Sequence, residues 1–326
     1  MLISRTPLRI SIGGGGTDLP SYYERRGGFF ISAAIAKYMF IAINRTPNEQ
    51  YLLKYSELER CNEIAEIRHP IIRAVLDEHP LDPGVEIVSV ADIPAGAGLG
   101  SSGAFTVGLL RAIYGLNREH VAPGALAEEA ARIEIELLNE PVGKQDQFIA
   151  SFGGLTCFEI SQDGHVTVSP LAISNETLHK LEERLLLFFT GQARAAGEIL
   201  ADQHARSQAD DAEMLDNLDR TKALGVEIKD ALESGHPERF GELMNEHWQR
   251  KRRRSEGISN EDIDRWYEIG IDNGAIGGKL VGAGRGGFLM FYADDPTAVR
   301  AAMAEQGLPE TRFAFDFDGS VVLVRD

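Results

Sequence analysis

Glycines and hydroxyl side chains stand together in one stretch of the sequence, Asp92–Phe105, which reads D-I-P-A-G-A-G-L-G-S-S-G-A-F. Glycine leaves the backbone free to take positive φ angles and to approach a ligand closely. Ser101 and Ser102 stand where this loop meets Phe105–Tyr114, an apolar run without proline that predicts a helix. A helix N-terminus carries unpaired N–H groups and about half a unit of positive charge, which suits phosphate. A tight turn without a ligand is the alternative, but the glycines beside paired serines favour a phosphate-binding loop.

Two known loop patterns can be compared with this stretch. The P-loop pattern G-x-x-x-x-G-K-[ST] is excluded because no lysine precedes the serines. The dinucleotide pattern G-x-G-x-x-G fits at Gly98, Gly100 and Gly103, but it asks for an acidic residue about 20 positions further on, after a second strand. Residues Asn117–Pro123 form a polar turn in that region instead. An NAD(P)-dependent oxidoreductase is therefore the second interpretation.

A second stretch that could take part in chemistry has a carboxylate between two amide side chains. Lys144–Phe148 reads K-Q-D-Q-F, and each neighbouring glutamine could orient the carboxylate of Asp146, as a catalytic base requires. A helix N-cap explains the same pattern equally well. Upstream, Glu134 stands beside the apolar stripe of a helix predicted over Pro123–Leu138, so its side chain could turn toward the interior.

The beginning of the sequence also leads into glycines. Met1–Ile12 alternates apolar and polar residues, which predicts a strand, and it runs into Gly13–Gly16. Such a strand must bring its backbone close to something or turn sharply. Arg9 and Asp18 flank the glycines. A hairpin turn with a solvated aspartate and a binding loop are equally favoured by these residues alone.

Two stretches near the C-terminal end complete the set. Arg250–Arg254 is the only dense basic run in the sequence. We divide its interpretation evenly between a solvated helix end and a site for an anionic group of a substrate, since arginine forks match phosphate oxygens. Lys279–Tyr292 again satisfies G-x-G-x-x-G, but a predicted strand follows it where a dinucleotide loop requires a helix.

Composition limits the classes of protein that these stretches could serve. The chain has 326 residues, enough for two lobes with a core each, and its formal net charge of −17 argues against nucleic acid or an anionic membrane as a partner. Cys61 and Cys157 form no metal-binding pattern, and no apolar run is long enough to span a bilayer, so we expect a cytoplasmic protein.

Predicted elements place these stretches in an α+β fold with two lobes, which we divide into residues 1–170 and 171–326. Successive strands with short turns, then a strand, a glycine loop and a helix, are expected to form the first lobe. The second lobe contains a long helical stretch from about Ala193 to Ser234, broken near Ser207–Asp210, and a helix over His236–Arg254, and the strand Ser320–Val324 completes it. The remaining strands are predicted at Gly28–Ala36, Tyr38–Asn44, Gln50–Tyr55, Val85–Val90, Gly154–Ile160, Val166–Val168 and Leu185–Thr190.

The three glycine-rich stretches together resemble the signatures of the GHMP kinases, the family of galactokinase, homoserine kinase, mevalonate kinase and phosphomevalonate kinase. P-A-G-A-G-L-G-S-S-G is similar to the family's phosphate loop P-x-G-x-G-L-G-S-S-A, with Gly103 for the final alanine, which we expect to loosen the helix start. P-L-R-I-S-I-G-G-G-G-T-D-L resembles the first signature, K-L-V-G-A-G-R-G-G the third, and G-K-Q-D-Q-F the family's G-x-M-D-Q-F. The resemblance covers essentially the whole chain. It implies the two-lobed GHMP kinase fold, with an N-terminal lobe of ribosomal-protein-S5-like type and a ferredoxin-like C-terminal lobe with extra helices.

The resemblance also implies roles for matching residues, with ATP and Mg²⁺ as cofactors. Asp146 falls on the family's proposed catalytic base and Arg9 on its arginine beside the transferred phosphate, while Ser102 and Glu134 would bind magnesium. Residues expected to hold ATP are Pro94, Gly96, Gly98, Leu99, Gly100, Ser101, Ser102 and Gly103. Residues expected to contact the sugar are Gly15, Gly16, Thr17, Asp18, Lys144, Gln145, Lys251, Arg253, Gly284 and Gly286.

The implied activity is ATP-dependent phosphorylation of a small sugar. Gly15–Gly16 and Lys144–Gln145 are similar to the heptose-phosphate kinases of the family. The expected substrate is therefore D-glycero-D-manno-heptose 7-phosphate, phosphorylated at its anomeric hydroxyl. The alternatives are an unphosphorylated mannose-, fucose- or uronate-like sugar, or a nucleotide-binding regulator without catalysis. We expect a monomer or homodimer.

Overall fold

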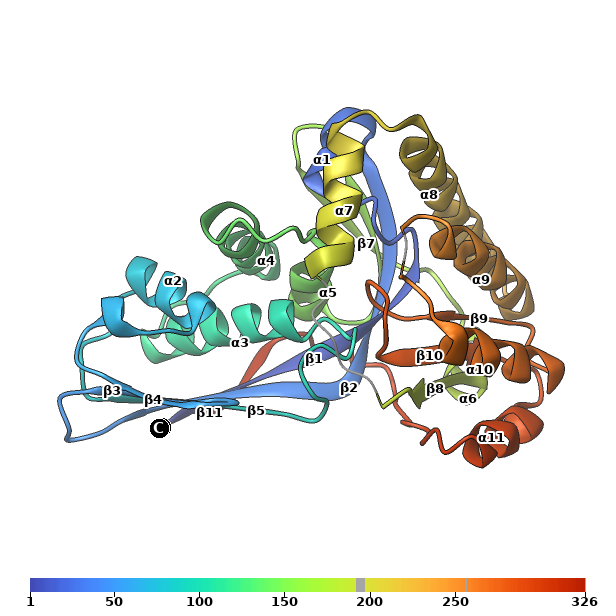
Figure 1. Ribbon diagram of the computed structural model, residues 1–326. Helices are drawn as coiled ribbons and strands as arrows, with labels where there is room; N and C mark the ends of the chain where they lie inside the picture. The colour runs from blue at the N-terminus through green and yellow to red at the C-terminus, as the bar shows by residue number, and fades with distance from the viewer. Residues whose placement is uncertain (192–196, 256, 326) are drawn as a thin grey trace.

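A mixed sheet of eight strands occupies the left and centre of the molecule in Figure 1, a computed structural model that describes residues 1–191, 197–255 and 257–325. Its strands run in the order β11-β1-β2-β5-β3-β4, and β6 joins through β2, with β7 beside β6. The bounds of these strands are β1 Leu2–Gly13, β2 Gly28–Arg45, β3 Tyr51–Lys54, β4 Leu58–Cys61, β5 Val85–Ala91, β6 Leu155–Ile160, β7 Val166–Pro170 and β11 Val321–Arg325.

The long strand β2 holds this sheet together, because it pairs antiparallel with β1, β5 and β6. The sequence predicted two strands here, Gly28–Ala36 and Tyr38–Asn44, and that prediction was wrong. The pairing of β2 with β1 shifts register here, because Pro7 lies opposite Tyr38 whereas the next residue, Leu8, lies opposite Ile35. A bulge of this kind accommodates extra residues without ending the strand.

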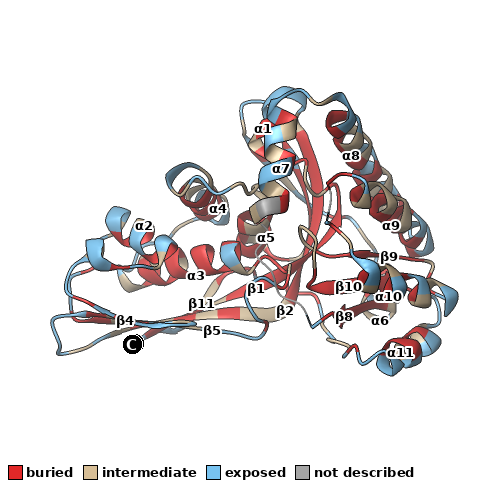
Figure 2. Cartoon of the chain, viewed as in Figure 1, coloured by how far each residue is buried: buried red, intermediate tan, exposed pale blue. Residues whose placement is uncertain are grey.

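Helices of the N-terminal half of the chain cover one face of the eight-stranded sheet (Figure 1). The helix α3 packs on β1 and β2 and is largely buried (Figure 2). Its buried residues are mostly apolar. The helix predicted over Pro123–Leu138 is present, but its last part, η2, is a π-helical turn. The helical elements of this part of the chain are α1 Pro20–Arg26, η1 Ile64–Glu66, α2 Pro70–Glu78, α3 Ser101–Leu116, α4 Pro123–Arg132, η2 Ile133–Leu137 and α5 Gln145–Phe152.

A second sheet of three strands, in the order β8-β10-β9, forms a separate apolar core with the helices beside it at the right of Figure 1. The strands are β8 Leu185–Phe189, β9 Gly277–Leu280 and β10 Phe288–Tyr292. The helices are α6 Asn175–Arg184, α7 Gly197–Gln208, α8 Ala212–Glu233, α9 Pro237–Arg252, α10 Glu261–Asp272 and α11 Pro296–Glu305. The predicted start of the long helical stretch, residues 193–196, lies outside the described residues.

The α+β class with two sheets is as predicted, but the last strand belongs elsewhere. The strand β11 pairs antiparallel with β1 in the first sheet, where the sequence analysis had assigned Ser320–Val324 to the second lobe. Local periodicity predicts a strand but not its pairing partner, which depends on contacts between distant residues. The division at residue 170 stays a prediction. Within the described residues, no helix is long and apolar enough to cross a membrane.

Candidate active site

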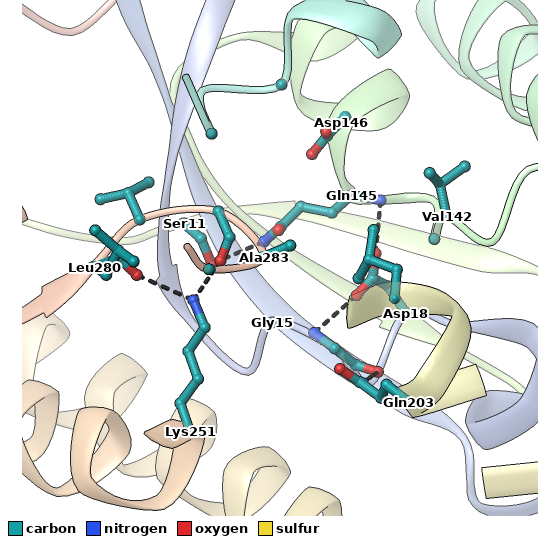
Figure 3. Close-up of a pocket in the computed structure, with 18 of the residues that line it drawn as sticks. Ser11, Gly15, Asp18, Val142, Gln145, Asp146, Gln203, Lys251, Leu280 and Ala283 are labelled. Atoms are coloured by element: carbon teal, nitrogen blue, oxygen red, sulfur yellow. Dashed lines mark hydrogen bonds between the residues drawn. The ribbon is translucent and has the colours of Figure 1, made fainter. Parts of the chain in front are cut away.

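A cavity of about 270 Å³ lies where loops of the two sheets meet, and Figure 3 shows it in close-up. This volume is near the lower end of the ~300–1,000 Å³ typical of sites for small molecules. Its lining comes mainly from β1 and the loop after it, the loop before α3, the start of α5, α7, the end of α9 with the turn that follows, and β9 with the loop after it.

The loop before α3 and the loop after β9 are in direct backbone contact. A Cβ atom at Gly98 would lie 2.6 Å from the carbonyl oxygen of Val281, and one at Gly287 would lie 2.3 Å from that of Ala97. Gly98 and Gly287 also have positive φ angles, 82° and 105°. Both loops therefore require glycine at these two positions.

Not every predicted member of the phosphate loop faces the cavity. Gly96, Gly98, Gly100, Ser101 and Ser102 line it, and Gly100 takes φ 74° as the N-cap of α3. In contrast, Pro94 is exposed outside the cavity, and the buried Leu99 contributes its carbonyl oxygen as acceptor for the Arg9 backbone N–H, at 3.0 Å.

Gly103 allows close packing between two helices, whereas its expected loosening of the start of α3 stays a prediction. Gly103 is buried, and a Cβ atom there would lie 2.7 Å from the Cβ of Asp146 and 3.1 Å from the backbone nitrogen of Gln147. The missing methyl group therefore lets α5 approach the start of α3.

The carboxylate of Asp146 is oriented by an arginine. The Nε atom of Arg9 donates to Oδ1 of Asp146 at 2.7 Å, and its Nη1 donates to the carbonyl oxygen of Gly98 at 2.6 Å. The Arg9 side chain is only 8% exposed, so its two contacts fix the carboxylate relative to the glycine loop. Asp146 lies in the first turn of α5, whose N-cap is Lys144, so the N-cap interpretation of Asp146 was wrong.

The sequence suggested that the two neighbouring glutamines orient Asp146, but in the structure they bind other residues. The Nε2 atom of Gln145 donates to Ser11 Oγ at 3.1 Å, and that of Gln147 donates to Glu134 Oε1 at 3.1 Å. Adjacent residues of a helix point in different directions, which explains why three consecutive side chains reach three different partners.

A serine and a buried glutamate form a small group of oxygen atoms beside the glycine loop. Ser102 Oγ donates to Glu134 Oε2 at 2.7 Å, and Glu134 lies in the π-helical turn η2 with only 2% of its surface exposed. Burial raises the pKa of the Glu134 carboxyl, against hydrogen bonds from Ser102, Thr106 and Gln147 that lower it. Gln147 Oε1 is buried without a partner among the described residues.

These oxygen donors fit a magnesium ion, which prefers hard oxygen ligands and keeps several waters. The Glu134 carboxylate is buried without a salt-bridge partner within the described chain, and a bound cation would compensate that cost.

The loop after β1 presents Asp18 to the cavity together with Gly15 and Gly16. The Asp18 carboxylate accepts the Gly16 N–H at 2.9 Å and the Gln145 N–H at 3.1 Å. Burial raises the pKa of Asp18, and the charge of Asp146 adds to this, while the two N–H donors lower it. Thr17 was predicted to contact the sugar, but it lies outside the cavity, where its hydroxyl is within 2.9 Å of the Gly14 and Phe29 carbonyls.

The basic run divides between the cavity and the surface. Lys251 and Arg254 are buried and line the cavity, whereas Arg253 is exposed outside it, which contradicts its assignment to the substrate. Lys144 also does not reach the cavity, because its Nζ donates to Glu128 Oε2 and to the carbonyl oxygen of Gly164, each at 2.8 Å.

The sequence analysis missed several cavity-lining residues, and those with basic side chains are His247, Arg254 and Lys279. A signal for two of them existed, because His247, Lys251 and Arg254 follow the i, i+4, i+7 spacing of one helical face. Burial lowers the pKa of Lys279 to about 7, with a contribution from Arg9, and that of Arg254 to about 10. Burial and the neighbouring Lys279, Arg254 and Arg9 charges lower that of Lys251 too. The loop after β9 adds Gly284 and Gly286 to the lining.

Comparison with known proteins shows that the chain is similar to sugar kinases. The pattern described as "GHMP kinases N terminal domain" matches residues 62–154, and "GHMP kinases C terminal" matches residues 228–307. A D-glycero-alpha-D-manno-heptose 7-phosphate kinase of Campylobacter jejuni is 30% identical, with 97% of each chain covered.

Two other proteins show how far the similarity extends. A bifunctional fucokinase/GDP-fucose pyrophosphorylase of Arabidopsis thaliana is 26% identical over 93% of this chain, which spans 31% of that longer protein. The crystal structure of a D-glycero-D-manno-heptose 1-phosphate kinase from Bacteroides thetaiotaomicron superimposes with a TM-score of 0.80 over the full length of both chains, at 23% identity. That likeness confirms the fold.

Proposed function

Because the chain belongs to the GHMP kinase family, we propose that it transfers the γ-phosphoryl group of ATP to the anomeric hydroxyl of D-glycero-D-manno-heptose 7-phosphate, forming the 1,7-bisphosphate. One observation carries the proposal: Arg9 joins the Asp146 carboxylate to the Gly98 carbonyl of the glycine loop. A carboxylate fixed beside a phosphate-binding loop can orient a hydroxyl for attack on the terminal phosphate.

Each part of the cavity would have a defined task in this reaction. N–H groups of the loop Gly96–Ser102 and the N-terminus of α3 would hold the phosphates of ATP. Ser102 and Glu134 would hold Mg²⁺, which when bound neutralises charge between the β- and γ-phosphates.

The substrate hydroxyl would hydrogen-bond to Asp146, which orients it and receives its proton either in full or in part. Its oxygen forms the new bond to the γ-phosphorus, and the bond from that phosphorus to the bridging oxygen of ADP breaks. Arg9 would stabilise the negative charge on the transferred group, since it lies between Asp146 and the loop.

The choice of a heptose phosphate rests on the C. jejuni relative and on the cations of the cavity. Lys251, Arg254 and Lys279 bring positive charge into a chain whose net charge is −17, which suits a substrate with its own phosphate. The fucokinase relative favours a second candidate, an unphosphorylated fucose-like sugar. The dinucleotide pattern at Gly98, Gly100 and Gly103 lies within the kinase loop, so the oxidoreductase interpretation is set aside.

The test is ATP consumption with Mg²⁺ against a panel of sugars and sugar phosphates. We expect the highest kcat/KM with the heptose 7-phosphate, a lower value with the same heptose lacking its phosphate, and little turnover of fucose. Higher kcat/KM with an unphosphorylated sugar would contradict the substrate assignment, and ATP binding without turnover on any sugar would instead indicate a regulator.

A further inference from the structure

One face of α9 and the turn that follows it bring three nitrogen-bearing side chains into the cavity. His247, Lys251 and Arg254 are 3%, 8% and 5% exposed, and all three line the cavity. Figure 3 shows Lys251 extending from the end of this helix toward Leu280. We call these three side chains the α9 triad.

The two cations of the α9 triad have only neutral partners. Lys251 Nζ donates to the carbonyl oxygens of Leu280 and Gly282. The Arg254 guanidinium donates to Asn217 Oδ1 at 3.1 Å and to Thr221 Oγ1 at 2.9 Å. In the described ranges, neither side chain forms an ion pair with a carboxylate.

Nearby carboxylates are already engaged with other groups. Asp146 is paired with Arg9, and Asp18 accepts two backbone N–H groups. Lys279 adds a further buried cation, whose Nζ donates to the Ile12 carbonyl oxygen at 3.0 Å. Asp18 acts on the charge of Arg254 but forms no ion pair with it, so burying these like charges together stays costly and an anionic ligand would offset that cost.

His247 gives an independent sign that this face binds a ligand. Both ring nitrogens are buried without a hydrogen-bond partner among residues 1–191, 197–255 and 257–325. Buried polar atoms are nearly always paired in folded proteins, and an unpaired imidazole that lines a cavity can donate to or accept from a bound molecule.

The Arg254 guanidinium still has a nitrogen that could turn to a ligand. Its Nη1 atom lies 3.4 Å from the Gly15 carbonyl oxygen and 3.5 Å from Gln203 Oε1, longer than the usual ~2.9–3.0 Å. These contacts are weak, so a phosphate oxygen could replace them. They also place the guanidinium against the loop after β1, next to Asp18.

We propose that the α9 triad is the receptor for the phosphate that the sugar substrate already carries, separate from the loop that holds the phosphates of ATP. This inference rests on the proposed sugar-phosphate kinase activity and assigns its selectivity for a phosphorylated sugar to α9. Arg254 would bind two phosphate oxygens through its fork, Lys251 would add a second charge, and His247 would donate a hydrogen bond.

The kinetic test compares Arg254→Met with Arg253→Met, an adjacent arginine whose side chain is exposed outside the cavity. Loss of a charge-assisted contact worth ~1.5–3 kcal/mol should raise KM for heptose 7-phosphate about 10- to 150-fold in Arg254→Met. KM for ATP should stay within about twofold, and Arg253→Met should match the wild type. An equal rise in KM for ATP, or no change in either constant, would overturn the proposal.

A binding test examines the phosphate receptor independently of catalysis. Thermal unfolding is followed with and without inorganic phosphate while a non-hydrolysable ATP analogue with Mg²⁺ fills the nucleotide site. We expect phosphate to raise Tm of the wild type and of Arg253→Met, and to leave Tm of Arg254→Met and Lys251→Met unchanged. Each variant is compared with itself, so altered stability does not affect the result.

The two tests fail in different ways. If no sugar phosphate is turned over but the phosphate-induced shift is lost only in Arg254→Met and Lys251→Met, the proposed function is wrong and the receptor is supported. If the sugar phosphate is a good substrate but all variants keep the shift and the wild-type KM, the receptor is wrong and the function is retained.

Discussion

Replacing Gly103 by alanine would place a methyl group where α3 and α5 approach most closely. The added Cβ would lie 2.7 Å from the Cβ of Asp146, whereas carbon atoms in contact prefer about 3.5–4.0 Å. Because its neighbours are the backbone and Cβ of α5, no flexible side chain can move aside to make room. The start of α5 must therefore move by about 1 Å, and Asp146 with it.

The expected loss is larger in catalysis than in stability. Overpacking costs about 1–3 kcal/mol, and the higher helix propensity of alanine returns up to about 1 kcal/mol, so the net destabilisation is about 0–2 kcal/mol. A displacement of about 1 Å in a reacting group can cost about 100-fold in rate. We expect kcat of Gly103→Ala to fall about 10- to 100-fold.

The assay is steady-state turnover of ATP with the sugar phosphate, together with the free energy of unfolding. Gly124→Ala is the matched control, since it also adds a methyl group to a helical glycine but meets only Phe152 Cζ at 3.7 Å. That variant should keep the wild-type kcat. Wild-type kcat in Gly103→Ala would refute the reasoning that this glycine sets the position of Asp146.

Two other predictions concern the metal and the charge of the cavity. Ser102→Ala should raise the Mg²⁺ concentration needed for half-maximal turnover because it removes an oxygen ligand, and it should lower the free energy of unfolding by only about 1–3 kcal/mol through the lost hydrogen bond to Glu134; equal activity at all Mg²⁺ concentrations would contradict this. Binding of the sugar phosphate should be tightest between about pH 6, where the phosphate becomes dianionic, and about pH 7, where half of the Lys279 ammonium groups have lost their proton. KM should therefore rise with pH above 7, and a Lys279→Met variant that kept the same rise would show that another group is responsible.

The glycine-rich stretches were predictable because their requirement is local. A positive φ angle disfavours a side chain, and a backbone pressed against another backbone leaves no room for one, so glycine is required where both conditions hold. Gly98 and Gly287 meet both conditions. This local requirement explains why the glycine-rich stretches alone indicated both the fold and the position of the cavity.

The roles of charged residues were less predictable, because orientation depends on distant contacts. The run Arg250–Arg254 is uniform in composition, yet Arg254 is buried in the cavity and Arg253 lies at the surface. Helical spacing from His247 would have separated the two. Nothing in the residues around Lys144 shows that Glu128 and Gly164 lie near enough to bind its Nζ.

The most direct test of the central claim is identification of the product by phosphorus NMR. The protein is incubated with ATP, Mg²⁺ and D-glycero-D-manno-heptose 7-phosphate, and the position of the new phosphate ester is read from its coupling to the sugar protons. We expect one new ester, coupled to the anomeric proton, in amounts equal to ADP, and formed at least about 100-fold more slowly by Asp146→Asn. A new phosphate at another carbon, or equal rates in wild type and Asp146→Asn, would contradict the account.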